Sequence, residues 1–494
     1  MTVPVHPYRS GVFAPVEGEL REEVPLQVIE GQVPKELFGD FLRNGPNPRF
    51  EPEGRYHWFD GDGMVHRVRF ENGSARYTRR FLQTDAFRAE SAVGRSLWGS
   101  STERPDFARQ AALGLTVPFK NTANTDIVFH QGKVLAFWWL AGQAYALDAH
   151  TLDTLGPEEF GAQVRSISAH PKRDPRSGEL LYFDYQSQRP FLSTGIIGPD
   201  GVRRFQTEVP LDGPRLQHDM AFTERHVLLF DMALQWDPDE LKKGRTKVGV
   251  RRDKPSRIGV LRRGAPGETI RWFETDPFYM YHAINASESE EAITLWGCRI
   301  LNPVANPSGG ETVPTIGFLR IEPTLHRWTL NLRTGGVHHE ALDDRLAEFP
   351  RMDDRFAGGT FRYAVLPTLA REEPTLLFDG LDVHDFQAGN KDHLDYGAGR
   401  FGGELVFAPR SATAQEWDGW LVTLVAERGR EEAEVWVVEA NQVSRGPVAR
   451  LRIPFRVPIG FHADWAPGWA LPARTSKGMG QGTGQGMGQG RGKG

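Results

Sequence analysis

Short apolar runs separated by turn residues recur along the chain, and long helical periodicity is scarce. The runs are rich in β-branched and aromatic residues, and Gly and Pro punctuate the stretches between them, which is typical of strands joined by turns. Twelve such runs predict strands: Val65–Phe70, Ala75–Leu82, Lys133–Trp138, Leu180–Tyr185, His226–Asp231, Ile258–Arg262, Ala292–Trp296, His326–Leu332, Leu376–Asp379, Leu405–Ala408, Trp420–Ala426 and Ala433–Glu439.

This number of short strands favours one all-β architecture over the roughly three domains of about 150 residues that the length suggests. Sandwiches and simple barrels rarely use so many strands, whereas a propeller accommodates them because each blade needs about four. No repeat of about 40–45 residues is visible. A propeller built from this chain must therefore have strongly diverged blades.

One stretch, Arg215–Asp231, shows how the strands carry candidate chemistry. It reads as a tight hairpin, with a short strand at Met220–Phe222, a Glu-Arg turn and a second strand at His226–Asp231. His218 lies beside the first strand, next to an aspartate. A single histidine in or beside a strand recurs at three further places: His170, His282 and His462.

Two segments break the β pattern. Ala86–Phe119 has loosely spaced apolar residues and is predicted to contain helix, and Asp237–Thr246 is charged and helix-prone. One interpretation is a cap or loop over the β core, and the other is an apolar lip for an oily substrate. Ala86–Phe119 or Met232–Thr246 also offers a surface for membrane docking.

Bulk composition excludes several classes of protein. The net charge of −5 is small for 494 residues and argues against nucleic-acid binding. Cys298 is the one cysteine, which excludes an intramolecular disulfide and fits a reducing compartment. The first residues have no apolar segment of signal-peptide type, and no run approaches the ~20 apolar residues of a membrane span. We expect a cytoplasmic protein, membrane-associated at most.

The predicted domain organisation has three parts. Residues 1–30 form an N-terminal extension, and residues 31–472 form a single propeller domain. Residues 473–494 form a Gly/Gln-rich tail of low complexity, too rich in glycine to pack.

Spacing alone does not single out a metal site among the 15 histidines. No HExxH, HxH or CxxC motif is present. The four histidines beside strands are separated by 48, 64 and 180 residues, too far apart for a local site. Such gaps fit ligands that separate blades deliver to a common axis.

A series of motifs, in order along residues 31–465, makes the chain similar to the carotenoid cleavage oxygenases. This family contains carotenoid, apocarotenoid and lignostilbene dioxygenases and the retinal pigment epithelial membrane protein, a retinoid isomerase. The matching stretches include Phe41–Pro48, His57–His66, Asn121–Thr125, Ala169–Lys172, His218-Asp219, Pro255–Val260, His282 with Asn285-Ala286, Glu348–Arg351, Gly403–Arg410 and Gly460–His462.

The resemblance implies a seven-bladed β-propeller with a helical or loop cap over its metal-bearing face. It also implies one non-haem Fe(II) per chain on the propeller axis, with O2 as co-substrate. By motif, the ligands are His170, His218, His282 and His462. Imidazole suits Fe(II), and four neutral ligands leave the charge of the ion intact and two coordination positions open.

The resemblance further implies three glutamates that accept a hydrogen bond from ligand imidazoles and fix their tautomers. Glu348 and Glu404 match two of them. Trp139 stands where the third is expected, which by the family pattern leaves His218 without its carboxylate. A water, a backbone carbonyl or another carboxylate could take that place, or iron binding is weaker.

The residues that bind a phenol in stilbene-cleaving members of the family are missing from the matching stretches. Stilbene-cleaving members use a Lys just before the third Glu and a Tyr about 30 residues earlier to bind a phenol. Trp138 occupies the Lys position, and no Tyr lies between Tyr77 and Tyr145. The candidates for an apolar tunnel are Phe59, Trp138, Trp139, Phe278 and Phe461, for each of which core packing is the alternative.

The expected function is oxidative cleavage of a C=C bond in an apolar polyene, a carotenoid or apocarotenoid, to give two carbonyl products. Two alternatives stay open. One is cleavage of a stilbenoid, and the other is a catalytically silent propeller that binds an apocarotenoid or a partner protein. The tryptophan at position 139 favours the silent propeller, whereas the presence of all four histidines favours an enzyme.

Overall fold

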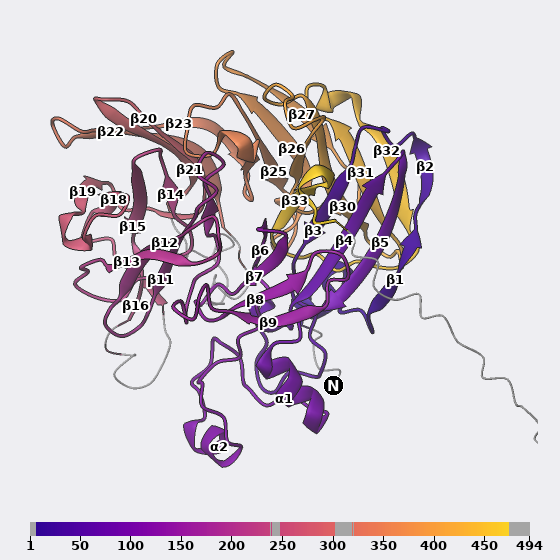
Figure 1. Ribbon diagram of the computed structural model, residues 1–494, viewed down its shortest axis with the longest axis horizontal. Coiled ribbons are helices and arrows are strands. Elements are labelled where there is room, and N and C mark those ends of the chain that lie inside the picture. The colour runs from indigo at the N-terminus through magenta and orange to yellow at the C-terminus, as the bar shows by residue number, and fades with distance from the viewer. Residues whose placement is uncertain (1–5, 238, 240–247, 302–318, 320, 474–494) are drawn as a thin grey trace, which may run out of the picture.

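Strands make up most of the regular structure and are arranged as the blades of a propeller (Figure 1). The structure, a computed structural model, describes residues 6–237, 239, 248–301, 319 and 321–473. All twelve predicted runs overlap observed strands, and Leu180–Tyr185, His226–Asp231 and Ala433–Glu439 match β11, β15 and β31 at both ends. The predicted all-β propeller is confirmed.

Blade 1 closes the ring by joining the two ends of the chain. Its strand order is β1-β5-β4-β3-β33, so the last strand pairs with strands from the first hundred residues. In the register, Arg43 lies opposite Ala463 and Gly39 lies opposite Pro467. The strands are β1 (Leu20–Pro25), β3 (Gly39–Arg43), β4 (Met64–Glu71), β5 (Ser74–Phe81) and β33 (Ala463–Pro467).

Blades 2, 3 and 4 are antiparallel sheets of four strands each. Blade 2 has β6 (Asp126–His130), β7 (Lys133–Phe137), β8 (Ala144–Asp148) and β9 (Thr154–Glu158). Blade 3 has β10 (Lys172–Arg173), β11 (Leu180–Tyr185), β12 (Leu192–Ile197) and β13 (Arg203–Glu208). Blade 4 has β14 (Ala221–Phe222), β15 (His226–Asp231), β18 (Ser256–Arg262) and β19 (Arg271–Thr275). A separate pair consists of β16 (Leu234–Trp236) and β17 (Val248–Val250).

Blade 5 is a separate sheet, whereas blades 6 and 7 share one because β28 (Arg400–Gly402) bridges β26 and β30. Blade 5 has β20 (Tyr279–Glu288), β21 (Ala292–Ile300), β22 (Pro323–Asn331) and β23 (Val337–Leu346). Blade 6 has β24 (Arg351–Met352), β25 (Tyr363–Leu369), β26 (Phe378–Asp385) and β27 (Asn390–Asp395). Blade 7 has β29 (Val406–Pro409), β30 (Gly419–Glu427), β31 (Ala433–Glu439), β32 (Pro447–Ile453) and the N-terminal strand β2 (Gln27–Gly31).

Burial follows the position of each strand within its blade. Central strands such as β30 are buried on both faces because a blade packs between two neighbours, whereas the outer strand β23 alternates between partly buried and exposed positions. This explains why central strands read as continuous apolar runs and outer strands are harder to find by sequence pattern.

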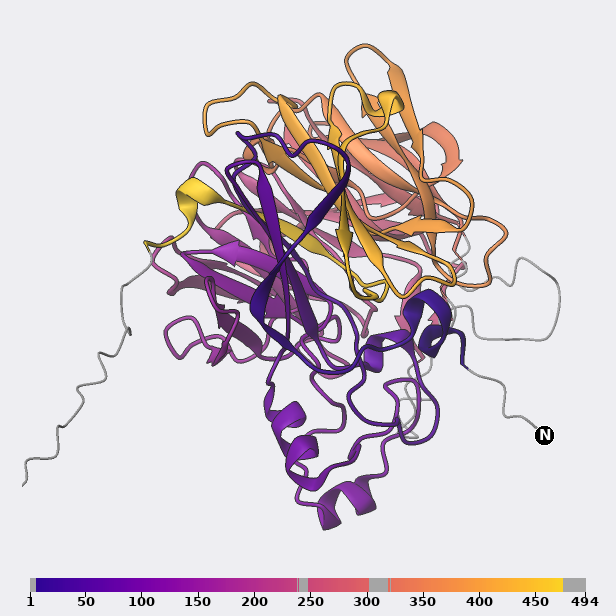
Figure 2. The same cartoon turned by 90° about the vertical axis from the view of Figure 1, so that its right-hand side faces the viewer.

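The segment between blades 1 and 2 contains two α-helices, as predicted for Ala86–Phe119. Helix α1 (Asp85–Val93) begins at Thr84, whose hydroxyl accepts from the N–H of Phe87, and ends at Gly94 with φ of 72°. Helix α2 (Phe107–Ala112) follows, and both project from one end of the molecule (Figures 1 and 2). Short 3-10 turns lie at Pro7–Arg9, Gly11–Phe13, Trp58–Asp60, Gly267–Thr269, Asp354–Phe356, Val443–Arg445 and Gly468–Ala470.

One of the predicted domain boundaries, at residue 30, can be compared with the observed strands. Strands β1 and β2 add outer strands to blades 1 and 7, so the boundary expected at residue 30 falls inside β2. Residues 474–494 of the predicted tail, and most of the charged segment 237–246, lie outside the described residues. Within the described chain, no helix has both the length and the apolar character to cross a membrane.

Candidate metal centre

The four histidines singled out in the sequence stand at the inner strands of four blades. His170 and His218 precede the inner strands β10 and β14, His282 lies within β20, and His462 immediately precedes β33. The other three blades place Asp126, Glu348 and Glu404 at or just before their inner strands β6, β24 and β29. Each blade therefore presents a polar or titratable side chain at the same point near the axis.

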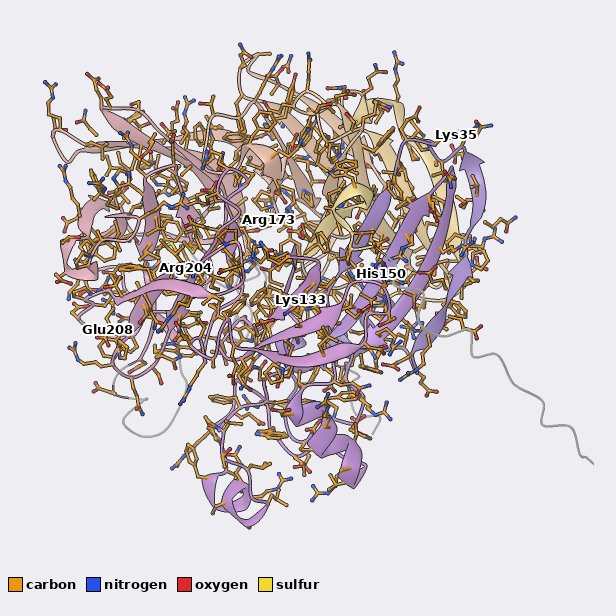
Figure 3. The ribbon with its side chains drawn as sticks, viewed as in Figure 1. Lys35, Lys133, His150, Arg173, Arg204 and Glu208 are labelled. Carbon is orange, nitrogen blue, oxygen red and sulfur yellow. The ribbon has the colours of Figure 1, made fainter. Side chains whose placement is uncertain are left out.

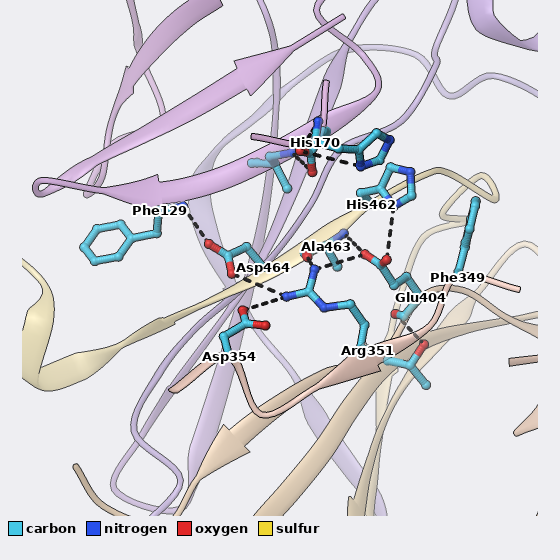
Figure 4. A network of polar contacts seen from close by, with 12 residues as sticks. Phe129, His170, Phe349, Arg351, Asp354, Glu404, His462, Ala463 and Asp464 are labelled. Carbon is cyan, nitrogen blue, oxygen red and sulfur yellow. Dashed lines mark hydrogen bonds and ion pairs between the residues drawn. The ribbon is translucent and has the colours of Figure 1, made fainter. Parts of the chain in front are cut away.

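The structure brings the four imidazoles together. One ring nitrogen from each lies within 4.8 Å of the others, and all four residues are buried. The ring centroids of neighbouring pairs are 4.5–5.0 Å apart, for example 4.5 Å between His170 and His462. Figure 4 shows these two rings next to each other.

The cluster has the properties of a metal site in its donor atoms and its protonation. Burial and the neighbouring histidines hold the pKa of His170 and His282 well below the usual value, and the pKa of His218 falls to about 3. Neutral imidazole is the form that binds metal. Nε2 of His170 and of His282 is buried without a hydrogen-bond partner, which is costly for a polar atom unless something else satisfies it. The residues therefore fit a divalent transition metal.

Glu348 and Glu404 stand behind two of the imidazoles, as the sequence predicted. Oε2 of Glu348 lies 2.5 Å from Nδ1 of His282, and Oε1 of Glu404 lies 3.0 Å from Nδ1 of His462. A carboxylate that accepts from Nδ1 leaves the Nε2 lone pair free for a metal. Burial raises the pKa of Glu348 well above its usual range, so positive charge nearby, such as a bound cation, favours its ionised form.

His170 is held through its backbone rather than its ring. Its φ of 68° lies in the left-handed region, which is uncommon for a residue with a side chain. The N–H of His170 donates to Oδ2 of Asp126 at 2.9 Å, and Nδ1 of the same ring is 3.9 Å from that oxygen. Asp126 thereby fixes the turn that aims this imidazole at the axis.

His218 has no carboxylate partner among the described contacts. Its ring packs against Tyr281, with centroids 4.8 Å apart and planes at 89°. Trp139, at the position expected for the third glutamate, packs on Phe59 with centroids 5.1 Å apart, and its indole N–H is buried without a partner. Aromatic packing replaces a polar contact on this side of the cluster.

An apolar cavity adjoins the cluster at His218, His282 and His462. Of the predicted tunnel residues, Phe59 and Phe461 line it. Trp138, Trp139 and Phe278 are not among the described lining residues, and Phe278 instead stacks on Trp328 in the core, with centroids 5.0 Å apart. The remaining lining residues come from loops and strand ends: Trp58, Thr125, Tyr281, Leu319, Ile321, Glu348, Phe349 and Leu376.

Sequence reasoning missed most of this lining, although some of it had a signal. Thr125, Tyr281 and Phe349 each lie within or beside a stretch that carries the family resemblance. Leu376 and Leu319 sit in loops with no such signal. Neither α1 nor α2 contributes a described residue to the lining of this cavity, and the helical or loop cap over the metal-bearing face stays a prediction.

A second cavity reaches the cluster at His170, His282 and His462, and its lining carries charged side chains among apolar ones. Arg351 lies at its centre: it is 2.9 Å from Asp354, 3.7 Å from Glu404 and 3.8 Å from Asp464 (Figure 4). The cluster thus faces an apolar space and a charged space at once.

The propeller and the four-histidine cluster define a class of protein: a β-propeller with a buried histidine cluster on its axis that fits a metal ion. Comparison with known proteins agrees. The family model of the retinal pigment epithelial membrane protein matches residues 13–467. The chain is 33% identical to a carotenoid 9,10(9′,10′)-cleavage dioxygenase of Phaseolus vulgaris, over 93% of this chain and 89% of that protein.

Two further comparisons extend the match to a bacterial relative and to a solved structure. A carotenoid cleavage oxygenase of Mycobacterium tuberculosis is 30% identical over 94% of this chain and 98% of that one. The crystal structure of the lignostilbene dioxygenase of Pseudomonas brassicacearum superimposes with a TM-score of 0.84 and 31% identity, covering 95% of this chain and 100% of that chain. The chain belongs to the family of the retinal pigment epithelial membrane protein and the carotenoid cleavage dioxygenases, and it is an enzyme of the dioxygenase type.

Proposed function

We propose that this protein is an Fe(II)-dependent dioxygenase that cleaves a C=C bond of a carotenoid or apocarotenoid with O2, giving two carbonyl products. One observation carries the proposal. One ring nitrogen from each of four buried imidazoles lies within 4.8 Å of the others at the end of an apolar cavity. Four nitrogen donors suit iron, and a bound Fe(II) supplies the centre that activates O2.

The contribution of the chain to this reaction is position and exclusion of water. Glu348 and Glu404 orient two imidazoles and keep their protons on Nδ1. Phe461 packs on Trp58 and Phe59, with centroids 4.3 and 5.0 Å apart, and forms a rigid aromatic wall. Such a wall aligns an extended apolar chain and keeps the reacting bond dry. No acid–base side chain is required by this scheme.

The apolar lining favours a polyene over a phenol. Aromatic and aliphatic side chains make up most of it, and Thr125 and Tyr281 contribute its hydroxyl groups. No lysine lines the cavity among the described residues. The ammonium that would favour a phenolate is therefore missing from this wall.

A second candidate, cleavage of a stilbenoid, has one observation in its favour. The lignostilbene dioxygenase shares 31% of its residues with this chain and superimposes over its full length. The two candidates differ in what they consume: a stilbenoid enzyme turns over resveratrol-like phenols, whereas the proposed enzyme turns over apocarotenals.

The test is iron content followed by O2 uptake. We expect anaerobically purified protein to hold about one iron per chain, and to consume O2 and release aldehydes when 8′-apocarotenal is added. His282→Ala should lose iron and uptake together. His338→Ala, an exposed histidine on outer strand β23, is the matched control and should change neither.

Two results would contradict the proposed function. Little iron after reconstitution with Fe(II), together with binding of the apocarotenal, would leave a silent binding propeller. Full activity in His282→Ala would show that the ligand assignment is wrong.

We also propose a cytoplasmic protein that touches membranes at its helical end, where an apolar substrate would be drawn from the lipid. Four large apolar side chains are exposed on this segment: Val93, Phe107, Leu113 and Val117. Scattered apolar residues are common on surfaces, but a group of them supports an interaction site. In a liposome flotation assay we expect association that Phe107→Ser weakens, and no flotation of the wild type would refute the contact.

A further inference from the structure

The polar cavity is axial, because all seven blades contribute to its lining. Its walls include residues of the inner strands β6, β10, β14, β20, β24 and β33, together with Glu404 just before β29. It meets the four-histidine cluster at His170, His282 and His462. The apolar cavity also meets the cluster, so one apolar space and one space that carries charged side chains lead to the same imidazoles.

The charged lining runs from partly exposed to fully buried side chains. At the outer end, the side chains of Asp354, Arg173 and Lys172 are 42%, 28% and 25% exposed. At the inner end, those of Asp219 and Glu404 are 1% and 3% exposed. Figure 3 places Arg173 near the middle of the face that it shows. A polar path thus connects solvent with the cluster.

Carboxylates outnumber basic groups along this path. Five of them line it (Asp126, Asp219, Asp354, Glu404 and Asp464), against Lys172, Arg173 and Arg351. A cleft with an excess of one charge concentrates ions of the opposite charge and raises their rate of arrival. A divalent cation cannot cross the apolar cavity at comparable cost, because stripping its water in an apolar space is strongly unfavourable.

The buried carboxylates have structural roles, which explain why they are present. These roles are compatible with a second role in attracting a metal ion. Asp464 accepts from the N–H of Phe129 in blade 2, and Asp219 accepts from the N–H of Ala283 in blade 5. Each bond ties one blade to another. These structural roles explain why the inner carboxylates are present. They do not explain why a basic side chain contacts Asp219, which is one of these carboxylates.

That basic group is Lys172, whose Nζ lies 2.5 Å from Oδ1 of Asp219. Asp219 is the residue after His218 and also accepts from the N–H of Met220 at 2.7 Å. The ammonium therefore sits on a buried carboxylate directly beside a cluster histidine. A quarter of the lysine side chain is exposed, so its long stem can swing towards solvent without unpacking the core.

We propose that the axial cavity is the path by which a divalent metal ion reaches the four histidines, and that Lys172 is the resident cation the incoming ion displaces from Asp219. The inference rests on the proposed function, because it needs the cluster to bind metal. It assigns separate entrances to the metal and to the apolar substrate.

The test measures the rate of metal uptake. Metal-free protein is mixed anaerobically with Fe(II), quenched with a chelator at set times and analysed for metal per chain. Asp354→Lys reverses a charge at the outer end and should slow uptake by about 3- to 10-fold at low salt, an effect that disappears near 1 M salt. Lys172→Met removes the competing cation and should speed uptake. The final content should stay near one metal per chain in both variants.

Two further variants serve as controls. Glu208→Lys makes the same charge change at an exposed site on the outer strand β13, near the edge of the face in Figure 3, and should leave the rate unchanged. Leu376→Trp fills the apolar cavity and should also leave it unchanged. Thermal unfolding of each variant verifies that it folds.

The outcomes separate the two proposals. The axial path would be overturned if the rate of metal uptake did not change with salt, with Asp354→Lys or with Lys172→Met. This holds whether or not Leu376→Trp slows uptake. Absence of metal uptake in the wild type would instead overturn the proposed function.

Discussion

Replacing Glu404 by glutamine tests how the centre controls the tautomer of a ligand. In the wild type the carboxylate has two donors: Nδ1 of His462 at 3.0 Å and the N–H of Ala463 at 2.5 Å. A glutamine of the same shape has one oxygen. If that oxygen keeps the N–H of Ala463, the amide NH2 faces Nδ1 and makes it an acceptor. The imidazole proton then moves to Nε2, where it blocks a metal.

The size of the effect follows from comparable partners of metal ligands, whose loss typically lowers metal affinity ~10–100-fold. This corresponds to about 1.4–2.7 kcal/mol of binding free energy. Folding should be affected less, because the side chain keeps its volume and at least one hydrogen bond. We therefore expect the Glu404→Gln protein to be folded but to hold its metal weakly.

Competition with a chelator of known affinity, at one pH and under anaerobic conditions, measures the change. Glu431→Gln is the matched control, because the side chain of Glu431 is 89% exposed and pairs with Arg456 rather than with a cluster histidine. An affinity for metal within about twofold of wild type in Glu404→Gln would refute the reasoning, since the expected loss is at least ~10-fold.

Three other substitutions test the surroundings of the centre. Trp139→Phe should keep full metal content and change the free energy of unfolding by less than ~1.5 kcal/mol, because the indole N–H has no partner; loss of metal would reveal a role for it. Phe461→Ala should cost ~3–5 kcal/mol in urea denaturation, since its ring packs between Trp58 and Phe59; a cost below ~1 kcal/mol would contradict this packing. Arg351→Met should destabilise the protein by ~3–5 kcal/mol, because it leaves buried carboxylates without their cation; a neutral change would show that water replaces the guanidinium.

The strands could be predicted from the sequence because central strands of a propeller are buried on both faces. Runs such as Leu180–Tyr185 and Ala433–Glu439 are mostly apolar or aromatic and are bounded by turn residues, so both their existence and their bounds are readable. The inner strands β10, β14 and β24 have two residues each. Their pairing depends on the ring around them, and no local pattern reveals them.

The site was readable only in part, for a related reason. The histidines and glutamates belong to stretches that resemble a known family, and the structure brings all of them to the axis. The residues that line the cavity could not be predicted from the sequence. An aromatic residue gives the same sequence signal whether it lines a cavity, as Phe461 does, or fills the core, as Phe278 does. The polar axial cavity was not foreseen, since its carboxylates are scattered over the whole length of the chain.

The fourth imidazole enters the structure together with the strand that closes the ring. His462 directly precedes β33, and β33 pairs with β3, about 420 residues earlier in the chain. While the ribosome is still making the protein, β3 has an unpaired edge and the centre has three of its four donors. Unpaired edges are prone to wrong pairing, so the last strand to emerge both protects this edge and completes the centre. Full metal affinity therefore requires synthesis to pass residue 462, and a chain truncated before this residue should hold metal more weakly than the full chain.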